Sequence, residues 1–204
     1  MPALKDLSII IDYPRSSEID LPLEAFTGAS HVTTLNLTPI CHLTLPHPWP
    51  LTNLTIDCGQ DNGACYSPCI GTILACKNTL RTCTILSEFG RMLALQHSPR
   101  EPTKFPCLET LDLRQAAMDF CELIACPNLR SLRLSAWTLP ESVRPFEALH
   151  VMLKTSSDCK TLRSLTLEGL PYERGQDFTA CMQRLPNLIA LTLKNDDGEE
   201  LLLG

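Results

Sequence analysis

The chain has 204 residues and a formal net charge of −6 at pH 7, so it presents no basic field that would attract nucleic acid. No run of about 18 apolar residues is present, and we therefore expect no membrane span and no membrane partner. The hydrophobic fraction of 44% is enough for a continuous core, and because aromatic residues make up only 5%, we expect an aliphatic core.

The pattern Leu-x-x-Leu-x-Leu, with Ile, Val or Cys at some positions, recurs eight times and predicts eight short strands. The copies begin 19 to 33 residues apart. This spacing resembles the leucine-rich repeat, whose unit is one strand followed by a returning helix or 3₁₀ segment. In chain order, the predicted strands span residues 4–9, 32–37, 51–56, 80–85, 108–113, 129–134, 162–167 and 188–193.

Apolar residues at helical spacing between these strands predict the returning segments. The copies at 32 and 51 are too close for a full helix, so a 3₁₀ or extended return is expected there. Residues 39–50 are rich in Pro and His and predict a tight loop, with an extra strand at 43–45. The predicted helices span residues 21–29, 67–77, 89–95, 115–126, 141–154 and 173–185.

These elements predict one α/β domain over residues 1–204. The expected architecture is a leucine-rich repeat solenoid of about eight repeats. It has a curved parallel β-sheet on the concave face, with helices, 3₁₀ segments and loops on the convex face. The first copy begins at Leu4 with no polar cap before it, although a solenoid needs capped ends. We therefore expect an N-terminal cap or module to be missing from this chain.

Cysteine usage bears on the cell compartment. The segment Met1 to Leu7 lacks the basic and apolar stretches of a signal peptide, so we expect a cytoplasmic or nuclear protein. Eleven cysteines are present, and Cys107, Cys126 and Cys159 lie just before predicted strands. A small buried hydrophobe fits that place, and free cysteine is one. Most of the thiols are therefore interpreted as reduced core residues.

Two copies share a cysteine three residues before the first leucine, in Cys126-x-x-Leu129 and Cys159-x-x-Leu162. This spacing resembles the cysteine-containing leucine-rich repeats of F-box proteins. The uneven gaps and the Pro-Asn-Leu joints are most similar to the F-box-type repeat proteins of mushroom-forming fungi. The resemblance implies the substrate-recognition part of a ubiquitin ligase, which binds the ligase adaptor only through an F-box.

The chain departs from that family in two respects. Leu21-Pro22-Leu23-Glu24 matches the opening of an F-box, but the strand predicted from residue 32 leaves no room for the helical module. We therefore expect the F-box itself to be absent. The commonest repeat class also has a buried Asn three residues after the third leucine. Three copies carry other residues at that place, namely Ala116, Trp137 and Leu170.

Residues between the buried leucines should point to solvent on the concave face. Charged residues concentrate on the strands that begin at 108, 129 and 162, and arginine is enriched at interface hot spots. We therefore expect a protein partner there, whose identity the sequence does not predict. The alternative is simple cross-strand pairing, worth roughly 0.2–1 kcal/mol per pair. The candidate partner-binding residues are Glu109, Asp112, Arg114, Arg130, Arg133, Arg163, Thr166 and Glu168.

No motif predicts an enzyme, because the chain lacks a nucleophile elbow, a phosphate-binding glycine loop and a His-Glu-x-x-His sequence. No catalytic residue and no cofactor are expected. A zinc site could be built from Cys58, Cys65, Cys69, Cys76 and Cys83, but only Cys65 and Cys69 approach the usual ligand spacing. The leading interpretation is a protein-protein interaction module of the F-box-like class. The alternatives are a scaffolding or sensor repeat protein without a ubiquitin role, and a zinc-binding or thiol enzyme.

Overall fold

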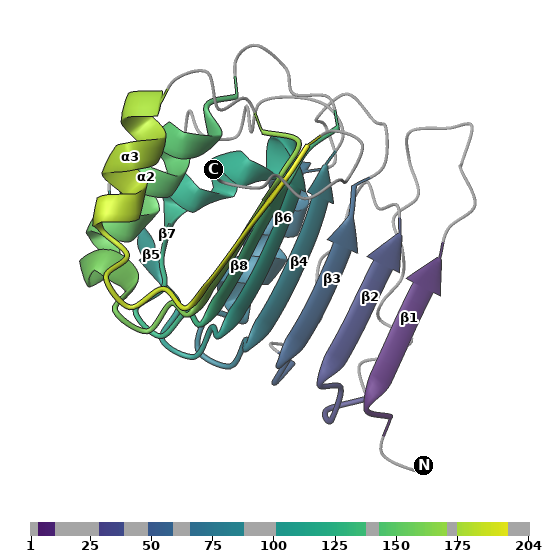
Figure 1. The fold of residues 1–204 in the computed structure, drawn as a ribbon. Coiled ribbons are helices and arrows are strands. Elements are labelled where there is room, and N and C mark those ends of the chain that lie inside the picture. Colours follow the sequence, from purple (N-terminus) through teal and green to yellow (C-terminus); the bar gives the residue numbers. More distant parts are fainter. Residues whose placement is uncertain are drawn as a thin grey trace.

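Eight parallel strands form the main sheet of the protein (Figure 1). The computed structural model describes residues 4–10, 29–38, 49–58, 66–87, 101–137, 143–170 and 175–195. The strand order follows the chain and confirms a mixed α/β fold built on a large parallel sheet. The strands are β1 (Asp6–Ile10), β2 (Thr34–Thr38), β3 (Asn53–Asp57), β4 (Thr82–Ser87), β6 (Thr110–Gln115), β8 (Ser131–Ser135), β9 (Ser164–Glu168) and β10 (Ala190–Lys194).

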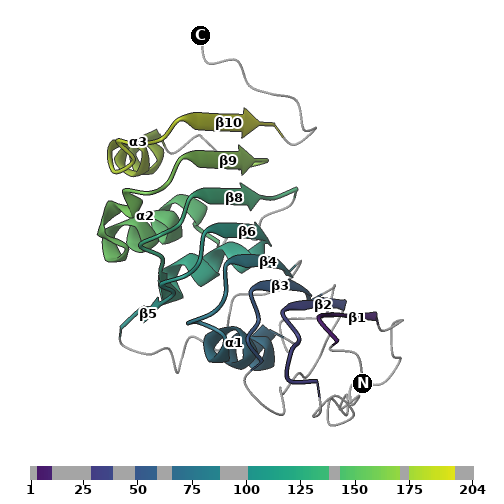
Figure 2. The same ribbon diagram turned by 90° about the horizontal axis from the view of Figure 1, so that it is seen from below.

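The returning segments include α-helices, 3₁₀ helices and a small second sheet. The helices α2 and α3 lie on one side of the main sheet, and α2 also packs against the 3₁₀ helix η3 (Figures 1 and 2). No helix among the described residues is long and apolar enough to cross a membrane. These elements are α1 (Tyr66–Ala75), η3 (Ala116–Leu123), α2 (Pro145–Thr155), η4 (Ser157–Cys159), α3 (Gly175–Gln183), and the paired short strands β5 (Thr103–Lys104) and β7 (Ile124–Ala125).

Each Leu-x-x-Leu-x-Leu segment contains one strand of the main sheet, which starts two residues after the segment's first apolar residue. Side chains alternate between the two faces of a strand. In β6, Leu111 and Leu113 are fully buried, whereas Thr110 and Asp112 on the other face are partly exposed. The register aligns the buried leucines, so that Leu111 lies beside Leu132 of the next strand.

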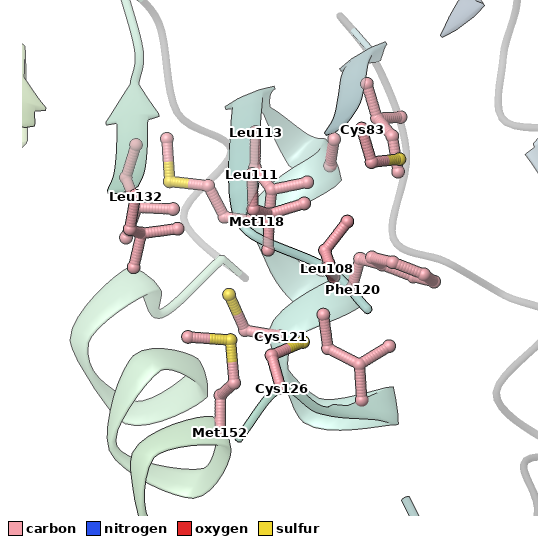
Figure 3. Close-up of a cluster of buried hydrophobic side chains, with 14 of the residues drawn as sticks. Cys83, Leu108, Leu111, Leu113, Met118, Phe120, Cys121, Cys126, Leu132 and Met152 are labelled. Carbon is pink, nitrogen blue, oxygen red and sulfur yellow. The ribbon is translucent and has the colours of Figure 1, made fainter. Parts of the chain in front are cut away.

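The core lies between the sheet and the returning segments (Figure 3). Leu111 from β6 meets Met118 and Cys121 of η3, and Met152 of α2 completes the cluster from the next unit. The aromatic contribution is small, with Phe120 at 6.2 Å from Phe105 in an edge-to-face pair. Burying each large aliphatic side chain contributes about 1.5–3 kcal/mol to folding. Core stability is therefore spread along the sheet.

The helix expected over residues 115–126 is wrong in type. A 3₁₀ helix occupies Ala116–Leu123, and Ile124–Ala125 form the strand β7 instead. Only 21 residues separate the starts of β6 and β8, so the chain must return along the sheet with few residues. A 3₁₀ helix rises about 2.0 Å per residue and an α-helix about 1.5 Å, so the 3₁₀ form covers the distance with fewer residues.

The other expected helices differ mainly at their ends. The helix α2 begins at Pro145 and not at residue 141, because proline lacks an N–H and suits the first helical turn. The helices α1 and α3 fall within or beside their predicted ranges. The predictions for residues 43–45 and 89–95 lie outside the described residues, as does the helix predicted over 21–29 except for Ala29, which has no regular secondary structure.

Side-chain hydrogen bonds connect successive segments where each enters the sheet. Asn128 Nδ2 donates to the carbonyl oxygen of Pro106 at 2.7 Å, and Asn187 Nδ2 donates to that of Lys160 at 2.9 Å. Thr161 Oγ1 donates to the carbonyl oxygen of Pro127 at 3.0 Å. Each donor directly precedes its segment's first leucine, and each acceptor lies two residues before the previous segment's first leucine. We call these three bonds the joint ladder.

A substitution in the core tests how strongly the register depends on leucine. Leu132→Ala removes a side chain that is 1% exposed, so we expect the free energy of unfolding to fall by about 2–5 kcal/mol. Urea unfolding followed by circular dichroism measures this change. The matched control is Ile189→Ala, which truncates a side chain that is 80% exposed and should change stability by less than about 0.5 kcal/mol. Equal losses in both variants would contradict the packing described.

Candidate functional site

The exposed face of the main sheet is organised in rows by the parallel register. Residues directly before the strands form one row along the sheet edge where the strands begin, and there the N–H groups of Glu109 and Thr110 donate to the carbonyl oxygen of Arg81 at 2.8 and 3.0 Å. The same pattern continues to the next two strands, and neighbouring strands lie about 4.8 Å apart. We call the residues Arg81, Glu109, Arg130 and Arg163 the entry row.

A second group lies toward the carboxyl ends of the strands. The register places Asp112 beside Arg133, and Arg133 beside Thr166. Two residues further along the strands, Ser135 of β8 lies between Arg114 of β6 and Glu168 of β9. We call the residues Asp112, Arg114, Arg133, Ser135, Thr166 and Glu168 the exit cluster. The eight residues predicted from sequence therefore divide, with Glu109, Arg130 and Arg163 in the entry row and the others in the exit cluster.

The charges of the exit cluster are paired with one another. Arg114 donates to both carboxylate oxygens of Asp112, at distances of 2.8 to 3.2 Å, and Arg133 Nη2 donates to Glu168 at 2.6 Å. The hydrogen bonds that Arg114 donates to Asp112 are the largest cause of the raised pKa of Arg114. Burial opposes this rise, and the charges of Asp112, Glu168 and Asp57 add to it. This arrangement agrees with the simple alternative of pairing within the sheet.

The exit cluster also holds polar atoms with unused hydrogen-bonding capacity. In the part of the chain that the structure describes, Arg133 Nε and Ser135 Oγ are buried without a hydrogen-bond partner. Ser135 is 4% exposed although it lies on the polar face of β8. A buried polar group without a partner costs about 1–3 kcal/mol. The exit cluster therefore combines paired charges with two buried polar atoms that lack a partner in the described part of the chain.

The entry row borders an open groove of about 350 Å³, which we call the entry groove. Arg81 Nη1 forms an ion pair with Glu109 at 2.9 Å, and both side chains are exposed. Arg163 Nη1 donates to the carbonyl oxygen of Asn187 at 2.9 Å. Among the described residues, the Arg130 side chain has no ion pair and no hydrogen bond. The groove is lined by Arg81, Pro106, Cys107, Glu109, Asn128, Arg130 and Thr161.

Sequence reasoning identified two of these lining residues, Glu109 and Arg130, and missed the others. The missed Arg81 could have been found, because it is the second residue of its segment, as Glu109 and Arg130 are of theirs. Cys107 was assigned to the core with Cys126 and Cys159. The structure buries those two but leaves Cys107 partly exposed in the groove, so that assignment is wrong. Cys107 directly precedes Leu108, at the position that Asn128 and Thr161 occupy in their segments, whereas Cys126 and Cys159 lie three residues before their first leucine.

The remaining thiols behave as buried hydrophobes. None of the eight cysteines whose side chains the structure describes forms a disulfide within those residues, and seven of the eight are buried. Burial raises the pKa of Cys76 to about 11 and that of Cys181 to about 12. Burial also raises the pKa of Cys83 to about 12, with a further contribution from Cys76. Reduced core cysteines are thus confirmed for most of the described thiols.

A metal site is not apparent in the described ranges. They contain no group of three or more His, Cys, Asp or Glu side chains that could hold an ion. Cys58, Cys76 and Cys83 are buried and form no disulfide within the described residues. The side chains of Cys65 and Cys69 lie outside it, so the zinc alternative stays untested.

Comparisons of the chain with protein-family models, with curated proteins and with solved structures found no match.

Thiol labelling tests the distinction between Cys107 and the buried cysteines. The thiolate is the reactive form, so a thiol with a raised pKa is almost fully protonated and inert at pH 8. We expect iodoacetamide to alkylate Cys107 well before Cys76, Cys83 and Cys181, as measured by peptide mass spectrometry. Adding denaturant should make all four react at similar rates. Early labelling of Cys83 in the folded protein would contradict the burial described.

A double-mutant cycle tests the pairing of the exit cluster. Arg133→Ala and Glu168→Ala, alone and combined, should give a coupling energy of about 0.2–1 kcal/mol in urea unfolding, because both partners are partly exposed. The coupling should shrink at high salt, since exposed charges are screened. A coupling of zero at low salt would mean that the ion pair does not contribute to stability.

Proposed function

We propose that this chain is a leucine-rich repeat solenoid that acts as a protein-protein interaction module. The observation that carries the proposal is the sheet itself. Eight parallel strands follow one another in chain order, each from one leucine segment, and their exposed residues form continuous rows. The partner lies across β6, β8 and β9 on the concave face of the solenoid, where the charged residues concentrate.

Three features support the repeat assignment. The units have uneven lengths but share one strand register, as expected when each unit stacks only on its neighbours. The returning segments are α-helical in some units and 3₁₀ in another, and both forms occur in this class of repeat. The joint ladder places a side-chain donor at the same point of three successive units. Such equivalence is typical of copies of one structural unit.

An extended polar face supports a binding role more than an enzymatic one. The main sheet has rows of polar side chains on its exposed face and an open groove at the edge where its strands begin. A typical small-molecule site is instead a concave and mostly apolar cavity. Arginine, which contributes strongly at interfaces, occurs in both the entry row and the exit cluster. A scaffolding or sensor role without ubiquitin chemistry would use the same face.

We assign the module to the F-box-like class, as the substrate-recognition part of a ubiquitin ligase. The cysteine spacing that suggested this class has a structural counterpart. Cys126 and Cys159 are both buried at the joints, and the Cys159 thiol donates to the carbonyl oxygen of Cys126 at 3.6 Å. The free thiols suit the reducing conditions of the cytoplasm or nucleus. Contact with the ligase adaptor would require an F-box encoded in the same gene product.

The ubiquitin-ligase role is tested on the product of the complete gene. We expect the adaptor subunit to co-purify with that product and to be lost when its F-box is deleted. A gene product without an F-box that fails to bind the adaptor would exclude this role, and the scaffolding alternative would then remain.

The location of the partner is tested by blocking the exposed face. Ser131 is the first residue of β8 and lies between Thr110 and Ser164 of the neighbouring strands, and an aromatic residue is well tolerated in a strand. Ligands selected from a random peptide display should bind Ser131→Tyr at least about tenfold more weakly than the unchanged protein. The control Lys154→Tyr, on an exposed position of α2, should bind normally. Equal binding to both variants would place the partner elsewhere.

A further inference from the structure

The entry row is a local concentration of positive charge on an acidic chain. It contains three arginines and one glutamate, which gives +3 − 1 = +2 over four neighbouring strands, whereas the whole chain carries −6. Because the strands lie about 4.8 Å apart, these four charges form a line along the sheet edge. A negatively charged ligand would find several cations within one Debye length of about 8 Å.

Among the described residues, one of the three arginines of the entry row has a side chain without a hydrogen-bond or ion-pair partner. Arg81 is neutralised by Glu109, and Arg163 uses one nitrogen on the carbonyl oxygen of Asn187. The side chain of Arg130 has no partner in the described part of the chain and lies between these two pairs. A guanidinium carries five N–H donors in a planar fork that matches a carboxylate. Arg130 therefore offers the strongest unused recognition group in the row.

The groove beside Arg130 has walls held in place by the joint ladder. The carbonyl oxygen of Pro106 accepts from Asn128, and Thr161 donates to the carbonyl oxygens of Pro127 and Leu129 at 3.0 and 2.8 Å. These bonds fix the lining residues before any ligand arrives. A pre-organised site loses less conformational entropy on binding, which favours affinity.

We infer that the entry groove binds an acidic segment of the partner protein, with a carboxylate paired to Arg130. The assignment rests on the proposed interaction function and specifies the chemistry of its ligand. An acidic segment fits better than a single small anion, because the cations continue along the row to Arg163 on the next strand. The exit cluster is a weaker candidate for the same ligand, since Arg114 and Arg133 already bind Asp112 and Glu168.

The test uses fluorescent peptides of six glutamates, six glutamines or six lysines, titrated into the folded protein and followed by anisotropy. We expect the glutamate peptide to bind most tightly and its affinity to fall as salt is raised. Arg130→Gln should weaken that binding by about tenfold, the loss expected for a hydrogen bond to a charged group. The control Arg144→Gln removes the same charge from an exposed arginine before α2 and should leave the affinity unchanged.

A second measurement locates the peptide. Cys107 lines the groove and is partly exposed, so bound glutamate peptide should slow its alkylation by neutral iodoacetamide. The lysine peptide should not slow it. Thermal denaturation of both arginine variants checks that neither change unfolds the protein.

The outcomes separate this inference from the proposed function. Equal glutamate-peptide affinity for Arg130→Gln and the unchanged protein, or no protection of Cys107, would overturn the groove assignment. Absence of any glutamate binding would overturn it as well. If display-selected ligands still lose affinity for Ser131→Tyr in that case, the interaction function stands and only the acidic ligand is wrong. If no ligand depends on the exposed face, the proposed function itself fails.

Discussion

The parallel backbone ladder is the constraint on which the rest of this molecule depends. At each entry to the sheet, one carbonyl oxygen accepts hydrogen bonds from two consecutive N–H groups of the next segment, from Lys5 through to Arg163. This pattern allows a single register, because a shift of one residue would turn every leucine to solvent. The buried leucine rows, the polar rows and the placement of the groove all follow from it.

The parallel register also determines which charged side chains have a partner. Glu109 directly precedes β6 and Asp112 lies within it, yet the two carboxylates have different partners. Asp112 is bound by Arg114, two residues along the same face of β6, whereas Glu109 is bound by Arg81 from the preceding unit. Arg133 is likewise held by Glu168 of the next strand. Arginines on neighbouring strands therefore differ in whether a partner is within reach, and Arg130 is the arginine of the entry row whose side chain has no ion pair or hydrogen bond to any described residue.

Much of this architecture could be predicted from the sequence, because leucine periodicity reports burial directly. The strands follow from that pattern, and so does the polar face. The conformation of η3 did not follow, because an apolar run such as Ala116–Leu123 fits a 3₁₀ helix and an α-helix equally well. The distance that the segment must span decides between them. The groove was missed because its lining residues, such as Cys107 and Thr161, come from joints whose side chains meet only when the units stack.

The parallel register has a geometric consequence for any partner that crosses the strands. The distance between equivalent side chains of successive units is set by the sheet at about 4.8 Å, whatever the length of the connecting chain. A peptide in the polyproline II conformation advances about 3.1 Å per residue with three residues per turn, so one turn spans about two strands and every third side chain lies on the same face. A peptide lying along the sheet edge would therefore meet alternate units, such as those of Arg81 and Arg130, with every third side chain. Insertions in the outer loops could alter the unit length freely and leave this spacing unchanged.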